Sequence, residues 1–399
     1  MIVAENRCPA CGQNGMTIFF EVANAPLVCN VLWDSRAAAA SAARGSIRLA
    51  HCSQCDMICN VDFDARRLEY TQQYENSLDY SPKFQAYVEQ LADRLVRRFR
   101  LYGKDIIEIG CGQGRFLGLM ARLGGNRGVG YDPSYDPARG LAEPGQAVRV
   151  HRELFGQAHA SGPADLICCR QVLEHIAEPI PFLRSIARAI AHRPETIVFF
   201  EVPNVLYTLK DMGIWDIIYE HCSYFSPGSL GRLFVRAGFE LLEVAQQYDG
   251  QFITVEARLR GPAEGWAEGA SPGEDLPGPD LADLVGRFRQ RCLAKISQWR
   301  RRLWPLERQG RRAVVWGAGS KGITFLNAMD VSSRQIEYVV DLNPHKHGRY
   351  LTGTGQRIVP PEFLRDYQPQ VIIVMNPLYQ SEISQAARRL GLQAEILLA

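Results

Sequence analysis

The sequence predicts an α/β protein with a small four-cysteine module at its N-terminus, a central doubly wound sheet and a smaller α/β unit at its C-terminus. Three observations support this prediction. Apolar strands run into glycine-rich turns at two places, residues 105–114 and 312–322. Strand-like and helix-like segments alternate after the first turn. Six of the eleven cysteines lie within the first 60 residues.

Composition and charge restrict the class of protein. The 399 residues are 46% hydrophobic, and 45 Lys and Arg residues nearly balance 43 Asp and Glu residues, which gives a net charge of +2. This balance offers no basic surface for nucleic acid or for an anionic membrane, so we expect a small-molecule substrate. The N-terminus has no signal-peptide pattern, and no apolar stretch is long enough to span a bilayer, which predicts a cytoplasmic protein. Nothing in the sequence indicates an oligomeric state.

Residues 1–66 form the predicted N-terminal module, which contains the pairs Cys8-x-x-Cys11 and Cys52-x-x-Cys55. Four thiolates on two tight turns suit a closed tetrahedral zinc site, although 40 residues separate the two pairs. Because four sulfur ligands leave no open position for water or substrate, we expect the zinc to be structural. The alternative is a set of reduced cysteines without metal in a small redox or structural module.

The central unit is predicted to span residues 67–259, with a helical segment over residues 65–102 near its start. The first strand leads into three closely spaced glycines, which let the backbone turn sharply and approach a ligand closely. The helix that follows offers unpaired N–H groups. A second strand ends in Asp132, and in such folds this carboxylate accepts hydrogen bonds from ribose hydroxyls. The candidate residues for binding a cofactor are Glu108, Gly110, Cys111, Gly112, Gly114, Asp132 and Gln171.

An insertion follows the fifth predicted strand, at the carboxyl end of the sheet where ligands of open α/β folds bind. It contains Tyr219, Glu220, His221 and Tyr224. A histidine beside a carboxylate and two tyrosines is suited to proton transfer, because imidazole titrates near neutral pH. The alternative is that Glu220 and His221 only hold the loop together. His175, which follows the fourth strand, is predicted to be structural.

The C-terminal part begins after residues 260–280, which are rich in glycine and proline and are predicted to form a linker. Residues 281–399 are predicted to contain a connecting helix and a Rossmann-like half domain with two or three strands. The helix keeps one apolar face, is predicted to end at Pro305, and carries arginines that are most simply a solvated face.

The second glycine turn, Gly317-Ala-Gly319-Ser-Lys321-Gly322, matches the dinucleotide fingerprint, and a strand ending in Asp341 follows it. Taken alone, this pattern predicts an NAD-dependent sugar-nucleotide oxidoreductase. A half fold and the cation of Lys321 favour instead a site for one phosphate-bearing ligand, with Lys321 as a point charge on the phosphate. A purely structural repeat is a further alternative.

The central unit resembles the class I S-adenosylmethionine-dependent methyltransferases over residues 105–258. Three groups of residues carry the resemblance, and they are Glu108-x-Gly110-x-Gly112-x-Gly114, Asp132, and Asp165 with Leu173-Glu174-His175. The resemblance implies that S-adenosylmethionine is the cofactor. It also implies that the glycine turn meets the amino-acid end of this cofactor and that Asp132 holds its ribose.

The order of the three parts, with the motif Asn376-Pro-x-Tyr379, resembles the deoxysugar C-methyltransferases across nearly all of the chain. This resemblance implies methyl transfer to carbon 3 of a nucleotide-linked 4-keto-deoxysugar, a structural zinc, and a sugar nucleotide between the middle and C-terminal parts. The candidate substrate-binding residues are Gly319, Lys321, Asn376 and Tyr379. The chain departs from the family pattern Tyr-x-Glu-His, because Ile218 stands two residues before Glu220.

The predicted chemistry requires a carbon nucleophile, since a ring C–H does not attack a sulfonium methyl group. A ketone on the neighbouring carbon makes the C–H acidic, and His221 is the expected base, oriented or tuned by Glu220. Tyr219 or Tyr224 is the expected donor to the enolate oxygen. An O- or N-methyltransferase acting on another sugar nucleotide or small metabolite is an alternative. A non-enzymatic, zinc-bearing scaffold protein is another.

Overall fold

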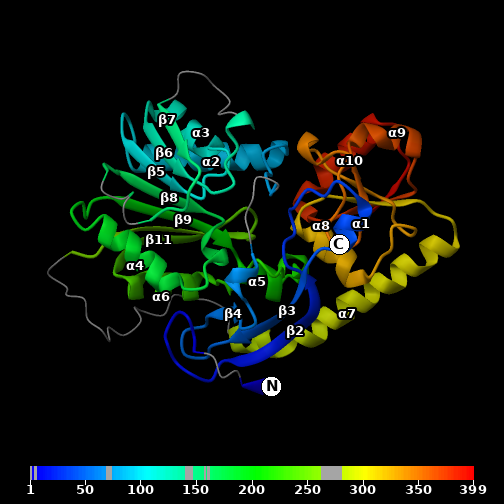
Figure 1. The fold of residues 1–399 in the computed structure, drawn as a ribbon, viewed down its shortest axis with the longest axis horizontal. Helices are drawn as coiled ribbons and strands as arrows, with labels where there is room; N and C mark the ends of the chain where they lie inside the picture. The colour runs from blue at the N-terminus through cyan, green and yellow to red at the C-terminus, as the bar shows by residue number, and fades with distance from the viewer. Residues whose placement is uncertain are drawn as a thin grey trace.

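The computed structural model has three β-sheets, one in each predicted part of the chain (Figure 1). It describes residues 2–3, 7–68, 74–139, 147–156, 159, 162–261 and 281–399. The predicted linker falls mainly on residues 262–280, which lie outside the described residues. The sheets and the four clustered cysteines confirm the predicted α/β fold class.

The N-terminal module is an antiparallel sheet that includes one strand from the central part of the chain. Its order is β1-β2-β3-β4-β10. The elements are β1 (Ile2–Val3), β2 (Thr17–Pro26), α1 (Arg36–Ala40), β3 (Arg44–His51), β4 (Ile58–Asn60), η1 (Ala65–Arg67) and β10 (Ser223–Tyr224). In the last pair of strands, Ser223 lies opposite Cys59 and Tyr224 opposite Ile58. The module is therefore continuous with the insertion that contains Glu220 and His221.

The central sheet has seven strands in the order β11-β12-β9-β8-β5-β6-β7. Its strands are β5 (Asp105–Ile109), β6 (Arg127–Tyr131), β7 (Val148–His151), β8 (Leu166–Arg170), β9 (Ile197–Pro203), β11 (Phe239–Gln247) and β12 (Phe252–Leu259). The five strands from β5 to β9 are parallel, and β12 pairs antiparallel with β9 and with β11. The strand order reverses between β5 and β8, and ligands of open α/β sheets bind outside the carboxyl ends of the strands at such a point. The first glycine turn, which follows β5, lies at this edge.

Helices cover both faces of the central sheet (Figure 1). The helices of this part are α2 (Pro82–Arg98), α3 (Arg115–Gly124), α4 (Pro179–Ala189), α5 (Val205–Leu209) and α6 (Pro227–Ala237), with the 3₁₀ turns η2 (Pro137–Arg139), η4 (Leu173–His175) and η5 (Ile214–Asp216). α2 and α3 share one hydrophobic core with Ile106 and Cys168, whereas α4 and α6 share another with Ile107 and Cys169. Since neighbouring strand residues point to opposite faces, a sheet covered on both sides needs strands that are apolar throughout.

The predicted helix over residues 65–102 is shorter in the structure. α2 begins at Pro82, because Ser81 Oγ accepts a hydrogen bond from Phe84 N at 3.3 Å and proline is favoured in a first turn. Residues 65–67 form the turn η1, and residues 69–73 lie outside the described residues. The apolar periodicity itself is confirmed, since it marks the buried face of α2.

The C-terminal sheet has five parallel strands in the order β15-β14-β13-β16-β17, not the two or three predicted. Its strands are β13 (Ala313–Trp316), β14 (Tyr338–Val340), β15 (Arg357–Val359), β16 (Val371–Val374) and β17 (Glu395–Leu398). The other elements are α8 (Ser320–Met329), η7 (Pro344–Lys346), η8 (Pro361–Phe363), α9 (Leu364–Tyr367), η9 (Pro377–Tyr379) and α10 (Gln380–Arg389). Strands of three residues, such as β14 and β15, are too short to give a clear pattern in the sequence. The complete sheet repeats the doubly wound order of the central one.

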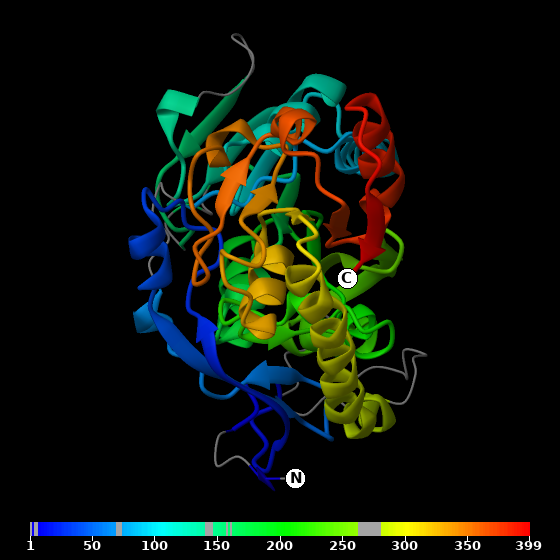
Figure 2. The same cartoon turned by 90° about the vertical axis from the view of Figure 1, so that its right-hand side faces the viewer.

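A long helix, α7 (Leu281–Arg308), joins the N-terminal sheet to the C-terminal part (Figure 2). The ring of Phe288 packs edge-on against Phe19 and Phe20 of β2, with centroids 5.9 and 5.2 Å away. Further along the helix, Trp299 packs against Phe325 of α8 at 5.1 Å. Pro305 does not end the helix as predicted, since α7 continues to Arg308 and the Pro305 carbonyl still accepts a hydrogen bond from Gln309 N at 2.9 Å. Among the described residues, no helix combines the length and the apolar character needed to cross a bilayer.

Polar side chains join the C-terminal part to the central part. The amides of Gln251 and Asn376 exchange two hydrogen bonds, from Gln251 Nε2 to Asn376 Oδ1 at 3.0 Å and from Asn376 Nδ2 to Gln251 Oε1 at 2.9 Å. Both residues are buried. The Tyr248 hydroxyl donates to the Tyr379 hydroxyl at 2.8 Å. These contacts fix the position of the C-terminal part relative to the central sheet.

We predict that Gln251→Met lowers the free energy of unfolding by about 1–3 kcal/mol, because it leaves the Asn376 amide buried without its partner. Urea denaturation of the full chain measures this change. Gln385→Met, at an exposed position of α10, is the control and should change the free energy by less than about 0.5 kcal/mol. Equal stability of the two variants would show that the amide pair contributes nothing to the interface.

Candidate functional site

The first glycine turn has a backbone that only glycine adopts easily. Gly110, Gly112 and Gly114 have φ angles of 69°, 54° and 75°, all in the left-handed region. A Cβ atom added at Gly110 would lie 2.2 Å from Val172 Cγ2, whereas one added at Gly112 meets no atom within 4 Å. α3 starts directly after the turn, and no side chain caps it. The turn is thus packed on one side, with open space at Gly112 for a ligand.

Asp132 closes the turn from the end of β6. Its Oδ2 accepts a hydrogen bond from Gly112 N at 2.8 Å, and its Oδ1 accepts one from Ser134 N at 2.8 Å. The carboxylate therefore lies beside the glycine turn, where the sequence predicts a contact with ribose.

Two of the predicted cofactor-binding residues lie beneath the turn. Glu108 is 3% exposed, and burial raises the pKa of its carboxyl to about 8, although the nearby Arg170 acts in the opposite direction. Cys111 is 8% exposed, and its sulfur packs so closely on Gly130 that a Cβ there would lie 2.5 Å from it. Burial raises the pKa of the Cys111 thiol, which keeps it protonated. Both side chains support the turn from below.

Gln171 lies at the carboxyl end of β8 in a left-handed conformation with φ of 55°. Its backbone N–H donates to the Glu201 carbonyl at 2.7 Å, and its Nε2 donates to Glu201 Oε1 at 3.2 Å. The next residue, Val172, is the one that packs on Gly110. Gln171 therefore connects the cofactor turn to η4, which ends in His175.

His175 and His221 lie against each other at this edge of the central sheet. Their ring centroids are 5.0 Å apart, and the Tyr224 ring lies 6.1 Å from that of His221. One polar side-chain atom of each of Glu174, His175 and His221 lies within 4.8 Å of the others. The structure therefore brings together a second histidine, which the sequence predicts to be structural, and the predicted base.

A backbone carbonyl holds the His175 imidazole. His175 Nδ1 donates to the Glu220 carbonyl at 3.0 Å. Burial lowers the pKa of His175 to about 4, while its hydrogen bond acts in the opposite direction. Burial also holds the pKa of His221 well below its ordinary value, and the neighbouring His175 and Lys321 lower it further. Both rings are therefore neutral at pH 7 and able to accept a proton.

Glu220 points away from this pair, toward the N-terminal module. Its Oε2 accepts a hydrogen bond from Cys29 N at 2.8 Å, and the residue has no exposed surface. Burial raises the pKa of this carboxyl to about 7, and hydrogen bonds from Cys29 and Tyr74 oppose that shift. Glu220 thus affects the histidines through its backbone carbonyl, which orients His175 and not the expected His221.

The two predicted tyrosines have different positions. The Tyr219 hydroxyl accepts a hydrogen bond from Asp64 N at 2.9 Å in the N-terminal module, and its ring packs on Phe63. The structure does not bring it to the histidine pair. Tyr224 is beside His221, and its hydroxyl donates to the Ile218 carbonyl at 3.2 Å.

The second glycine turn has a different backbone from the first, because only Gly317 among its glycines has a positive φ, of 121°. Gly319 is the N-cap of α8, and Asp341 Oδ2 accepts a hydrogen bond from Ala318 N at 2.8 Å. The ammonium of Lys321 pairs with Asp216 of the insertion, and buried Lys346 donates to the Ala318 carbonyl at 3.2 Å. Of the other predicted substrate residues, Asn376 and Tyr379 make the contacts to the central part described above.

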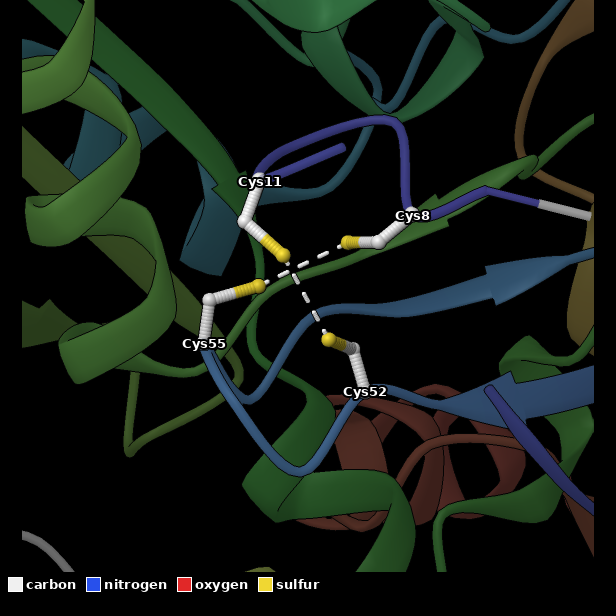
Figure 3. A group of neighbouring side chains, drawn as sticks. All are labelled: Cys8, Cys11, Cys52 and Cys55. Atoms are coloured by element: carbon white, nitrogen blue, oxygen red, sulfur yellow. Dashed lines mark hydrogen bonds between the residues drawn. The ribbon is translucent and has the colours of Figure 1, made fainter. Parts of the chain in front are cut away.

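The four cysteines of the N-terminal module converge on one point from two loops (Figure 3). The sulfurs of Cys8 and Cys55 are 3.5 Å apart, and those of Cys11 and Cys52 are 3.6 Å apart. All four sulfurs lie within 4.8 Å of one another. Zn–S bonds of about 2.3 Å in a tetrahedron would place the sulfurs roughly 3.8 Å apart. The spacing therefore fits one zinc ion.

Two residues near the site, Asp216 and Lys346, are missed by sequence reasoning. Neither has a local signal, because an ion pair between distant segments and a lysine placed by a separate loop are products of tertiary structure. His175, which the sequence predicts to be structural, lies beside His221.

Comparison with known proteins connects these features to a family. Residues 84–244 match a family model described as a methyltransferase domain, and residues 274–394 match one described as a C-methyltransferase C-terminal domain. The C-methyltransferase NovU of Streptomyces niveus is 27% identical over 321 residues, which are 74% of this chain and 72% of that protein. A ubiquinone biosynthesis O-methyltransferase of Aromatoleum aromaticum is 31% identical over 170 residues, which are 38% of this chain and 70% of that protein.

Among solved structures, a similar one is a Burkholderia thailandensis 1,6-didemethyltoxoflavin N1-methyltransferase with bound S-adenosylhomocysteine. The match covers 53% of this chain and 99% of that chain, at 16% sequence identity. Its TM-score is 0.36, and a score below 0.5 carries no argument.

We predict that the stability of the protein depends on pH through Glu174, whose pKa burial raises to about 8. Its ordinary pKa is about 4.3, so the folded state binds more protons than the unfolded state between these values and stability falls as pH rises through this range. Glu174→Gln cannot ionise and should be more stable than the wild type at pH 8.5 by at least about 1 kcal/mol. Thermal midpoints at pH 5.5 and 8.5 measure the effect. Glu178→Gln, at an exposed position, is the control. If the thermal midpoints of the wild type and of both variants fall equally between pH 5.5 and 8.5, Glu174 is not the group responsible.

Proposed function

Because the chain belongs to the class I S-adenosylmethionine-dependent methyltransferases, we propose that it transfers a methyl group to a carbon atom of a nucleotide-linked keto sugar. The acceptor proposed is carbon 3 of a 4-keto-deoxysugar. The observation that carries this proposal is the imidazole of His221, which lies 5.0 Å from the His175 ring at the carboxyl edge of the central sheet. The likeness to a C-methyltransferase over both the central and the C-terminal parts supports it.

The first glycine turn fits the cofactor. Open space at Gly112 lets a ligand approach the backbone, and the uncapped start of α3 offers N–H groups to a carboxylate. We propose that Gly110–Gly114, Asp132 and Gln171 hold S-adenosylmethionine, which supplies an electrophilic methyl group when bound. Cys111 within the turn and the buried Glu108 before it remain part of the proposed cofactor site.

In the proposed reaction, His221 removes the proton from the carbon beside the ketone as the enolate forms. A neutral imidazole has one unprotonated ring nitrogen, which can accept this proton. The enolate is negatively charged, and a nearby negative charge raises the pKa of an imidazole, which favours the transfer. Tyr224 is the proposed donor to the enolate oxygen, which would replace the Ile218 carbonyl as the acceptor of its hydroxyl proton. Tyr219 is not retained in this role, because its hydroxyl lies against the N-terminal module and not beside His221.

A second candidate ligand is NAD at the second glycine turn. The complete five-stranded sheet, with Asp341 at the end of β14, removes one argument against a dinucleotide. Two contacts of the second glycine turn disfavour NAD. Lys321 is paired with Asp216, and the ammonium of Lys346 donates to the Ala318 carbonyl of the turn. Calorimetry with S-adenosylhomocysteine and with NAD separates the two candidates, and binding of NAD alone would reverse our choice.

The proposed reaction is tested by incubating the protein with S-adenosylmethionine and a panel of nucleotide-linked keto sugars, followed by mass spectrometry and NMR of the products. We expect one added methyl group bound to carbon 3. A methyl ether or an N-methyl product would instead identify an O- or N-methyltransferase.

We predict that His221→Asn lowers kcat by at least about 100-fold, because a general base contributes roughly 10² to 10⁴ to such a step. The affinity for S-adenosylhomocysteine should stay within about twofold, since His221 is not part of the glycine turn. Steady-state kinetics and calorimetry measure the two quantities. The exposed His192→Asn should retain wild-type activity, and full activity of His221→Asn would remove the base assignment.

We also propose that Cys8, Cys11, Cys52 and Cys55 bind one structural zinc ion. We predict that the purified protein contains one zinc per chain and that Cys52→Ser loses it, whereas Cys292→Ala, at a cysteine outside the cluster, retains it. Elemental analysis measures the metal content. A strong chelator should lower the thermal midpoint, because zinc binding contributes to folding. Wild-type protein without zinc and insensitive to the chelator would contradict the site.

A further inference from the structure

Glu174, His175 and His221 form a second cluster of possible metal ligands, separate from the four cysteines. One ligand atom of each residue lies within 4.8 Å of the other two. Zinc bonds of about 2.1 Å to nitrogen and oxygen would place tetrahedral ligand atoms roughly 3.4 Å apart, so small side-chain movements bring the three atoms to one ion. Two histidines and a carboxylate are a set that proteins use for zinc and for ferrous iron, with an open position left on the ion.

The Glu174 carboxyl group has an oxygen that lacks a partner. Glu174 is 2% exposed, and in the part of the chain that the structure describes its Oε2 forms no hydrogen bond. A buried polar atom without a partner costs free energy, and such atoms are rare in folded proteins. A metal ion bound by this carboxylate would supply the missing interaction.

The hydrogen bond of His175 determines which of its ring nitrogens can bind a metal. Nδ1 lies 3.0 Å from the Glu220 carbonyl oxygen, which can only accept a hydrogen bond. Nδ1 therefore carries the proton, and Nε2 of the neutral ring has the lone pair that a metal requires. Histidine ligands of metal ions commonly donate their other ring N–H to a backbone carbonyl in this way.

Backbone groups hold together the two segments that provide the ligands. Glu174 and His175 belong to η4, whereas His221 belongs to the insertion. On one side of His221, Cys222 N donates to the Glu174 carbonyl at 2.9 Å, and on the other side the Glu220 carbonyl accepts from His175. These bonds keep the two imidazole rings 5.0 Å apart. Because the ligands are positioned before an ion arrives, binding costs little conformational entropy.

We propose that Glu174, His175 and His221 bind one divalent transition-metal ion such as Zn²⁺, and that this ion stops turnover by occupying His221. An imidazole nitrogen that binds a metal has no lone pair left to accept a proton, so the base of the reaction is lost. The inhibition rests on the proposed function, whereas the metal site does not.

Titration of the zinc-loaded full chain with Co²⁺ tests the site. Co²⁺ bound by nitrogen and oxygen absorbs visible light without the intense sulfur-to-cobalt bands of a cysteine site, so one spectrum distinguishes the two sites. We expect the wild type to bind one Co²⁺ in this way and Zn²⁺ to displace it. Glu174→Gln and His175→Asn should lower the affinity at least about 100-fold, since loss of an outer-shell partner alone costs about 10–100-fold. Glu178→Gln and His192→Asn, at exposed positions, are the matched controls and should bind Co²⁺ as the wild type does.

Kinetics test the inhibition. We expect a filled site to lower kcat of the wild type at least about 100-fold, because a general base contributes roughly 10² to 10⁴. Dilution into metal-free buffer should restore the activity. For Glu174→Gln, measured against its own activity without added metal, the Zn²⁺ concentration that halves turnover should rise by the factor by which its affinity for Co²⁺ falls.

Different outcomes overturn different parts of the proposal. A wild type without the visible cobalt bands, or with the same affinity as both ligand variants, would overturn the metal site. Unchanged or increased turnover with the site filled would overturn the inhibition. If the wild type forms no C-methylated product, the proposed function fails, and the cobalt spectra still decide the metal site. If His175→Asn does not fold, Glu174→Gln decides it, because glutamine keeps the size of the native side chain.

Discussion

A buried carboxylate determines how the parts of this protein are joined. Glu220 has no exposed surface, and a carboxylate without water needs hydrogen-bond donors from the protein. The Cys29 amide of the N-terminal module provides one at 2.8 Å. The next residue, His221, faces the opposite way and packs against His175 of the central part, while Lys321 of the C-terminal part pairs with Asp216 of the same insertion. The insertion therefore makes contacts with all three parts of the chain.

The two doubly wound sheets show how little a local motif determines. The five parallel strands of the central sheet have the same order as the five of the C-terminal sheet, and in both an acid at the end of the second strand accepts a hydrogen bond from the glycine turn at 2.8 Å. Both turns have open space at one glycine, Gly112 and Gly319. Their neighbours differ, because the second turn has Lys346 against it and its Lys321 is paired with the insertion. The chemistry available at each turn follows from these neighbours and not from the shared fold.

Sequence reasoning succeeds where local patterns are strong. Glycine spacing, apolar strands and paired cysteines predict the fold class, the glycine turn with Asp132 beside it and the four-cysteine cluster. It fails where side-chain direction depends on tertiary packing. Glu220 and His221 are adjacent in sequence and point apart, Tyr219 packs on the N-terminal module, and two C-terminal strands of three residues are too short to detect. The contacts of Asp216 have no local signal at all.

The pairing of β10 with β4 sets a limit on how this protein can be divided. The strand that follows His221, β10, completes the N-terminal sheet. The helices before and after it in the sequence, α5 and α6, belong instead to the central part. A gene fragment encoding the methyltransferase core alone would leave this strand with an unpaired edge, which invites aggregation. Recombination between related genes at the boundaries of the core would therefore tend to produce insoluble chimeras. The three parts can be expected to be inherited together.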